Sequence, residues 1–158
     1  MTIPLPTSGW KPHLSWAQRQ RRIKINMQFV RKVVETALPF CLEKPRYPES
    51  HLPKIVEITI VSDRVITKIH ADFLNDPTPT DVITFAHSEE VGEILIGAET
   101  VAAHAKRFYQ SVDHEVARCA LHGLLHLLGY DDMTPEEHTL MHTQQEGLLE
   151  RALTFCLP

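Results

Sequence analysis

The segment from His122 to Asp132, which reads HGLLHLLGYDD, constrains the fold more than any other part of the chain. Its two histidines lie four residues apart among apolar residues and without proline, which predicts neighbours one turn apart on a helix. Gly129 follows three residues after His126, where a left-handed turn that glycine adopts at low cost commonly ends a helix. We therefore expect the chain to double back there and to bring Asp131 or Asp132 toward both imidazoles.

This arrangement predicts a metal site whose ligands are His122, His126 and an aspartate. Two imidazoles on neighbouring turns can bind one zinc ion at about 2.0–2.1 Å each, and three protein ligands with an open position are typical of catalytic zinc. A carboxylate in the ligand set also suits manganese or iron. The alternative is a core helix whose two histidines bind other protein groups. The glycine and the acidic pair at this spacing favour the metal site.

The same residues resemble the signature HGxLHLxGYDH of the YbeY family of bacterial rRNA-maturation endoribonucleases. A second segment, PTDVITF at 79–85 followed by GEI at 92–94, is similar to the family's PT(N/D)VLSF…GDI segment. The resemblance covers residues 23–155. It implies a metal-dependent endoribonuclease that cleaves single-stranded rRNA in 16S rRNA 3′-end maturation and ribosome quality control. The implied partners are the small ribosomal subunit and an assembly GTPase.

Two positions depart from the family pattern. Asp132 stands where the family usually has its third metal-binding histidine, so Asp132 is the implied third ligand. Its negative charge should make the ion a weaker Lewis acid, although two histidines and one carboxylate do form catalytic zinc sites. Leu74 stands where the family usually has an arginine, which would stabilise charge on the phosphoryl oxygens. Arg118, one helical turn before His122, is a weak candidate to replace it, and an ordinary surface arginine is the alternative.

Two other functions fit parts of the pattern. A zinc metalloprotease shares the histidine spacing but places a glutamate directly after the first histidine as the general base. That position is Gly123 here, which cannot transfer a proton, so proteolysis is disfavoured. A ribosome-assembly binding factor with a structural metal is the stronger alternative, because the family arginine and third histidine are missing and no general base can be assigned. A second histidine pair, His138 and His142, lacks a following glycine and a third ligand, so both are predicted to be exposed.

Charge is distributed unevenly along the chain. Residues 1–34 contain seven bases and no acid (+7), whereas the remainder contains nine bases and twenty acids (−11), which together give −4. We predict a poorly ordered basic arm over residues 1–22, because three prolines interrupt it. Its bases and its two tryptophans, Trp10 and Trp16, suit contact with phosphates and stacking on RNA bases, and the alternative is a merely solvated tail.

The rest of the chain, 23–158, is predicted to form a single domain of α+β class. Strands are expected at 23–25, 55–61, 82–86 and 93–96, of which the last two should pair antiparallel because a short loop joins them. Helices are expected at 26–38, 62–73, 98–109, 114–128 and 134–153. Asn26 is the expected N-cap of the first helix, and the core face of the second should consist of Val65, Ile66, Ile69 and Phe73. This gives a small mixed sheet of about four strands packed with about five helices, with the metal site on a central helix. The three cysteines form no C-x-x-C motif, which indicates a reducing compartment. We find no signal peptide and no membrane span, so a cytoplasmic location is expected.

Overall fold

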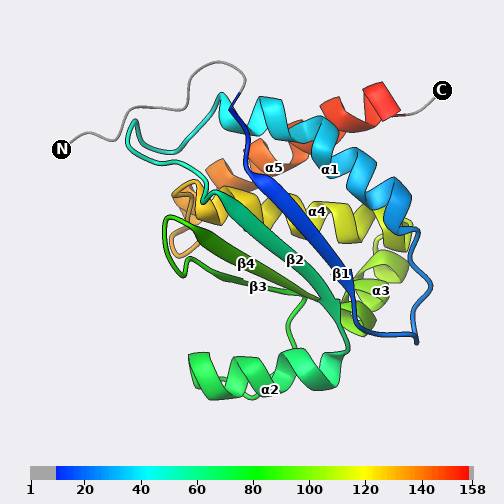
Figure 1. Ribbon diagram of the computed structural model, residues 1–158. Coiled ribbons are helices and arrows are strands. Elements are labelled where there is room, and N and C mark those ends of the chain that lie inside the picture. Colours follow the sequence, from blue (N-terminus) through cyan, green and yellow to red (C-terminus); the bar gives the residue numbers. More distant parts are fainter. Residues whose placement is uncertain (1–9, 157–158) are drawn as a thin grey trace.

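The structure, a computed structural model, describes residues 10–156, and Figure 1 shows the course of the chain. The described residues form four strands and five helices. In chain order they are β1 (His13–Gln18), α1 (Met27–Leu42), β2 (Ile55–Val61), α2 (Asp63–Leu74), β3 (Val82–Phe85), β4 (Val91–Gly97), α3 (Ala98–Arg107), α4 (Val112–Leu127) and α5 (Pro135–Cys156). The predicted α+β fold with a small mixed sheet is therefore confirmed. Within this part of the chain, no helix is long and apolar enough to cross a membrane.

The strands form one mixed sheet in the order β1-β2-β4-β3. β1 pairs parallel with β2, β2 pairs parallel with β4, and β3 pairs antiparallel with β4, as the short connection between them predicted. In Figure 1, α1, α4 and α5 lie on one side of the sheet and α2 lies alone on the other. β3 is the last strand in the sheet order, so it pairs with β4 along one edge and its other edge is free of strand pairing.

The two faces of the sheet bury different residues because successive strand residues point to opposite sides. In β4, Ile94 and Ile96 belong to the main core under α1, α4 and α5. Leu95 between them belongs to a smaller cluster under α2, together with Ile66 and Ile83. The main core is extended by the buried stripe of α1, whose N-cap is Asn26 as predicted.

The predicted arm over residues 1–22 is wrong for His13–Gln18, which form β1. The backbone of this strand is fixed at both ends, because the His13 amide donates to the Lys54 carbonyl at 2.8 Å and the Arg19 amide donates to the Ile60 carbonyl at 2.8 Å. Trp10 and Trp16 are partly buried against the main core, which leaves less of each ring for the predicted stacking on RNA bases. The part of that prediction that concerns residues 1–9 lies outside the described residues.

Two further expectations need correction. Residues 23–25 are not a strand, and the fourth strand of the sheet is β1 instead. The predicted core face of α2 is largely exposed: Ile66 is buried, whereas Val65 is 42% exposed and Phe73 is 71% exposed. On this face of the sheet, α2 meets another helix at its first residue, where Asp63 bonds to Glu99 and Thr100 of α3. The side chains of Val65 and Phe73 lie away from the sheet and stay largely exposed.

Candidate metal centre

The helix α4 that carries both histidines lies close against the sheet. Gly123 makes this approach possible, because a Cβ atom at this position would lie 2.7–2.8 Å from side-chain carbons of Ile94 in β4. Leu121, Leu124 and other residues on the same side of α4 are buried in the main core. His122 and His126 project from the neighbouring stripe of the helix and remain partly exposed. The packing of α4 therefore fixes the direction in which both imidazoles point.

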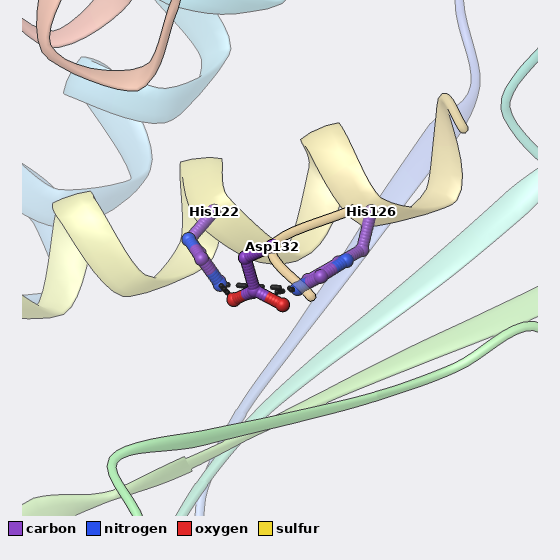
Figure 2. A group of neighbouring side chains, drawn as sticks. All are labelled: His122, His126 and Asp132. Carbon is purple, nitrogen blue, oxygen red and sulfur yellow. Dashed lines mark hydrogen bonds and ion pairs between the residues drawn. The ribbon is translucent and has the colours of Figure 1, made fainter. Parts of the chain in front are cut away.

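The turn after α4 returns the chain to these histidines, as Figure 2 shows. Gly129 has a φ of +96°, in the left-handed region that favours glycine, and a Cβ atom there would lie 2.6 Å from Oγ of Ser50. Asp132 follows this turn, and its Oδ2 lies 3.5 Å from Nε2 of His122 and 3.7 Å from Nε2 of His126. The two Nε2 atoms are 3.1 Å apart. One ligand atom from each of the three residues lies within 4.8 Å of the others, so these residues could hold a metal ion on α4.

Both imidazoles are oriented through their other nitrogen. Nδ1 of His126 lies 3.1 Å from the carbonyl oxygen of Tyr130, which can only accept, so this Nδ1 donates its proton. Nδ1 of His122 lies 2.7 Å from Oε1 of Gln145 in α5. The Nε2 of Gln145 donates to a carboxylate oxygen of Glu146 at 3.3 Å, which assigns the amide oxygen to His122. In the neutral imidazoles, both Nε2 atoms therefore carry lone pairs.

Three acceptors consequently meet at one point: two imidazole lone pairs and the carboxylate of Asp132. Such a group is electrostatically unfavourable unless a cation lies between its members. A divalent ion bound here would accept electron pairs from both Nε2 atoms and from the Asp132 carboxylate. The hydrogen bonds at Nδ1 are of the kind that usually orients histidine ligands of metals. Burial lowers the pKa of His122, although the hydrogen bond to Gln145 opposes this shift. The lowered pKa favours the neutral imidazole, which is the form that binds a metal.

Gln145 is the residue of this centre that the sequence analysis missed. It lies 23 positions after His122, in a different helix, and it is 6% exposed. No local spacing rule relates these two residues, because their contact depends on how α5 packs against α4. The Tyr130 carbonyl was also missed, although it belongs to the turn that the glycine predicted.

Arg118 lies on the wall of a cavity of about 280 Å³ that His122 and Asp132 also line. Its guanidinium is bound to two carboxylates: Nη1 pairs with Glu115, and Nε donates to Glu146 at 2.8 Å. Glu115 is only 7% exposed, so this part of the network is largely shielded from water. Arg118 is therefore near the candidate metal centre, but its donors already have anionic partners. Its use as a substitute for the family arginine stays a prediction.

A second cavity, of about 370 Å³, runs along the free side of β3, and we call it the β3 groove. All three candidate ligands line it on the α4 side. Leu74, at the position where the family pattern has arginine, lines it from the end of α2 and is 54% exposed. The structure thus brings Leu74 to the same groove as the candidate metal centre.

The second histidine pair and the nearby Cys119 and Met141 do not belong to the group of candidate ligands. His138 and His142 are both exposed, as predicted, and stack on each other with ring centroids 6.2 Å apart at the mouth of the first cavity. Cys119 is buried, and its burial raises the pKa of the thiol, which opposes the thiolate form that binds metals. Met141 is buried and also lines the first cavity.

Comparison with known proteins assigns this architecture to a family. The family model described as Endoribonuclease YbeY matches residues 15–153, which include the whole of α4 and the turn to Asp132. The chain belongs to the YbeY endoribonuclease family. The match begins within β1, so the YbeY domain includes this strand.

Several relatives named Endoribonuclease YbeY are similar over most of their length. The protein from Bacillus velezensis is 36% identical over 132 residues, which are 74% of this chain and 82% of the relative. The protein from Bacillus subtilis (strain 168) is 36% identical over 134 residues, which are 75% of this chain and 83% of the relative. The solution structure of TM1509 from Thermotoga maritima has a TM-score of 0.59 and 22% identity, with 88% of both chains covered. At that identity, the likeness to TM1509 shows a shared fold.

Replacing Gln145 by leucine is expected to weaken zinc binding roughly ten- to a hundredfold, the usual effect of losing an outer hydrogen-bond partner of a metal ligand. The leucine removes the acceptor that holds His122 with its Nε2 facing Asp132. Competition with a chromogenic chelator measures the affinity. Gln144→Leu, a change at the neighbouring position of α5, is the matched control and should bind zinc like the unaltered protein. Equal affinity of the Gln145 and Gln144 variants would contradict the assigned role.

Proposed function

We propose that this chain is a metal-dependent endoribonuclease that acts on single-stranded rRNA in 16S rRNA 3′-end maturation and in ribosome quality control. The observation that carries the proposal is the convergence of His122, His126 and Asp132, which leaves three acceptor atoms directed at one point. Family membership supports RNA as the substrate, because the relatives are named endoribonucleases. The small ribosomal subunit and an assembly GTPase are the proposed partners, and the cytoplasm is the proposed location.

In this proposal, His122, His126 and Asp132 hold a single ion, which is zinc or, because of the carboxylate, manganese or iron. When bound, the ion supplies Lewis acidity toward the phosphodiester and its attacking nucleophile. Gln145 and the Tyr130 carbonyl keep both imidazoles in the tautomer that presents Nε2. The cavity beside Arg118 and the β3 groove both adjoin the ligands, so a strand of RNA has access to them from two sides.

A second function is favoured by one specific observation. Among the described residues that line the two cavities at the centre, Arg118 is the one lysine or arginine, and it binds Glu115 and Glu146. Leu74 stands where the family pattern has arginine. A ribosome-assembly binding factor would need no positive charge for a phosphoryl group, and its metal would only brace the turn after α4. The two functions differ in turnover: metal removal abolishes RNA cleavage by a nuclease, whereas it lowers only the thermal stability of a binding factor.

The test is cleavage of an end-labelled RNA that spans the 3′ end of precursor 16S rRNA. The RNA is presented either single-stranded or annealed to its complement, with and without a chelator. We expect cleavage of the single strand, near the mature 3′ end, that the chelator abolishes and that added metal restores. Binding of the RNA without cleavage, by protein shown to contain its metal, would favour the binding factor.

A further inference from the structure

Three aromatic side chains form a partly exposed group at the end of the β3 groove. The ring of Phe73 meets the ring of Phe85 edge-on, with centroids 5.8 Å apart, and the Phe85 ring stacks on that of His87 at 5.5 Å. Phe73 is 71% exposed, and His87 is exposed as well. We call Phe73, Phe85 and His87 the aromatic rim. Phe85 anchors the rim, because it is partly buried against the cluster under α2.

The aromatic rim borders the β3 groove, although its three side chains are not among those that line it. Phe73 directly precedes Leu74, which lines the groove, and Phe85 lies between the groove-lining residues Thr84 and Ala86. On its other side the groove is lined by the three candidate ligands of α4 and the following turn. A single chain that lies along the free edge of β3 and extends past Leu74, Thr84 and Ala86 would therefore leave the ligands in the direction of the rim.

The charge of the groove limits what can bind the rim. Among the described residues that line the groove, none is a lysine or an arginine, and two, Asp81 and Asp132, are acidic. Phosphates of a nucleic acid would find no fixed cationic side chain along this path. The faces of the bases, in contrast, suit exposed aromatic rings, because stacking is available to every base and needs no charge.

We propose that the aromatic rim binds a base of single-stranded RNA by stacking, and so holds the strand in the β3 groove beside the metal centre. This inference rests on the proposed endoribonuclease function and names the way in which its substrate is held. In the family pattern an arginine contacts a phosphate at this place. Here Leu74 cannot do so, and stacking of a base on the neighbouring rim takes over the role of holding the RNA. A base-paired strand cannot offer a free base face at this position, so the same contact would also favour single strands.

The test compares Phe73→Ala with the unaltered protein on a labelled single-stranded oligoadenylate and on an abasic oligomer of equal length. Affinity is measured by fluorescence anisotropy in chelator, so that no cleavage occurs, and KM and kcat are measured with metal. We expect Phe73→Ala to weaken oligoadenylate binding and to raise KM roughly five- to a hundredfold, which is the loss of one stacked base. We expect kcat to stay within about twofold, and Phe73→Tyr, which keeps the ring, to behave like the unaltered protein.

Phe155→Ala is the matched control, because Phe155 is 68% exposed and also pairs with another ring, that of Phe40, at 6.0 Å. Phe155 lies near the end of α5, outside the groove, and its replacement should leave KM unchanged.

If the unaltered protein cleaves RNA and Phe73→Ala binds and cleaves it equally well, the stacking contact is refuted while the nuclease function stands. If the unaltered protein binds oligoadenylate no better than the abasic oligomer, stacking is refuted as well. Failure of the unaltered protein to cleave any single-stranded RNA would instead overturn the proposed function, and the stacking contact with it.

Discussion

Replacing His126 by alanine is expected to remove the bound metal and to lower RNA cleavage by at least about a thousandfold, because Lewis-acid catalysis of this kind contributes several kcal/mol. Two ligands would remain, and their acceptor atoms would no longer enclose an ion. His126 is partly exposed and its ring lies at the surface of the groove, so the variant should fold. Metal content per chain and the rate of RNA cleavage, measured on one preparation, give both results.

Three further variants test whether the loss of metal and of RNA cleavage is specific to the candidate ligands. His114→Ala changes a histidine in the same helix that stacks on Phe29 and takes no part in the cluster, so metal and activity should be unchanged. Asp132→Ala should lose the ion as His126→Ala does. Asp131→Asn should retain it, because the asparagine oxygen can still accept from the Asp132 amide as Asp131 does at 2.7 Å. Full metal and full activity in Asp132→Ala would refute Asp132 as a ligand.

Replacing Gly123 by alanine is expected to destabilise the fold, because the added methyl group would lie 2.7–2.8 Å from Ile94 carbons on a central strand. Overpacking of a buried contact costs about 1–3 kcal/mol. For a chain of this size, each kcal/mol lowers the melting temperature by roughly 2–4 °C. The free energy of unfolding from urea titration and the melting temperature from calorimetry measure the effect.

Gly147→Ala is the matched control for this prediction. Gly147 also lies inside a helix, but a Cβ atom there would have nothing within 4 Å. Both variants gain the same helical propensity of roughly 0.5–1 kcal/mol, so the difference between them isolates the packing against Ile94. We expect Gly147→Ala to be more stable than the unaltered protein and Gly123→Ala to be less stable. Equal stability of the two variants would mean that α4 can move away from the sheet at no cost.

The same packing explains why the site does not resemble that of a zinc protease. In that class, the residue after the first histidine is a glutamate beside the metal, whereas Gly123 is directed into the core against β4. A glutamate at this position would bury a charge without a partner, which folded proteins avoid. The glycine that disfavoured proteolysis on chemical grounds is therefore also required by the packing.

The sequence predicted those parts of the centre whose geometry is local. The histidine spacing on α4, the left-handed turn at Gly129 and the return of Asp132 all depend on residues within one short segment. The antiparallel pairing of β3 and β4 was predictable for the same reason, since a short connection joins them. In these segments, helical periodicity and turn chemistry determine the conformation with little help from the rest of the fold.

The parts that were missed depend on contacts between distant segments. β1 has few strand-forming residues, and its conformation is set by parallel pairing with β2, which begins about forty residues later at Ile55. Gln145 reaches His122 only because α5 packs across α4. The exposure of Phe73 could not be predicted from its place on the apolar face of α2, because it depends on where the helix lies on the sheet, which buries Ile66 and leaves Phe73 71% exposed.

Metal content and RNA cleavage, measured on the same preparation, show whether an ion bound by His122, His126 and Asp132 is catalytic. The protein is stripped with chelator, dialysed and reloaded with zinc, manganese or iron, and both quantities are recorded at each stage. A catalytic ion at this centre predicts one ion per chain, loss of cleavage with loss of the ion, and recovery of both on reloading. Full cleavage by the stripped protein would contradict it, as would a fully loaded protein that cleaves single-stranded rRNA no faster than His126→Ala.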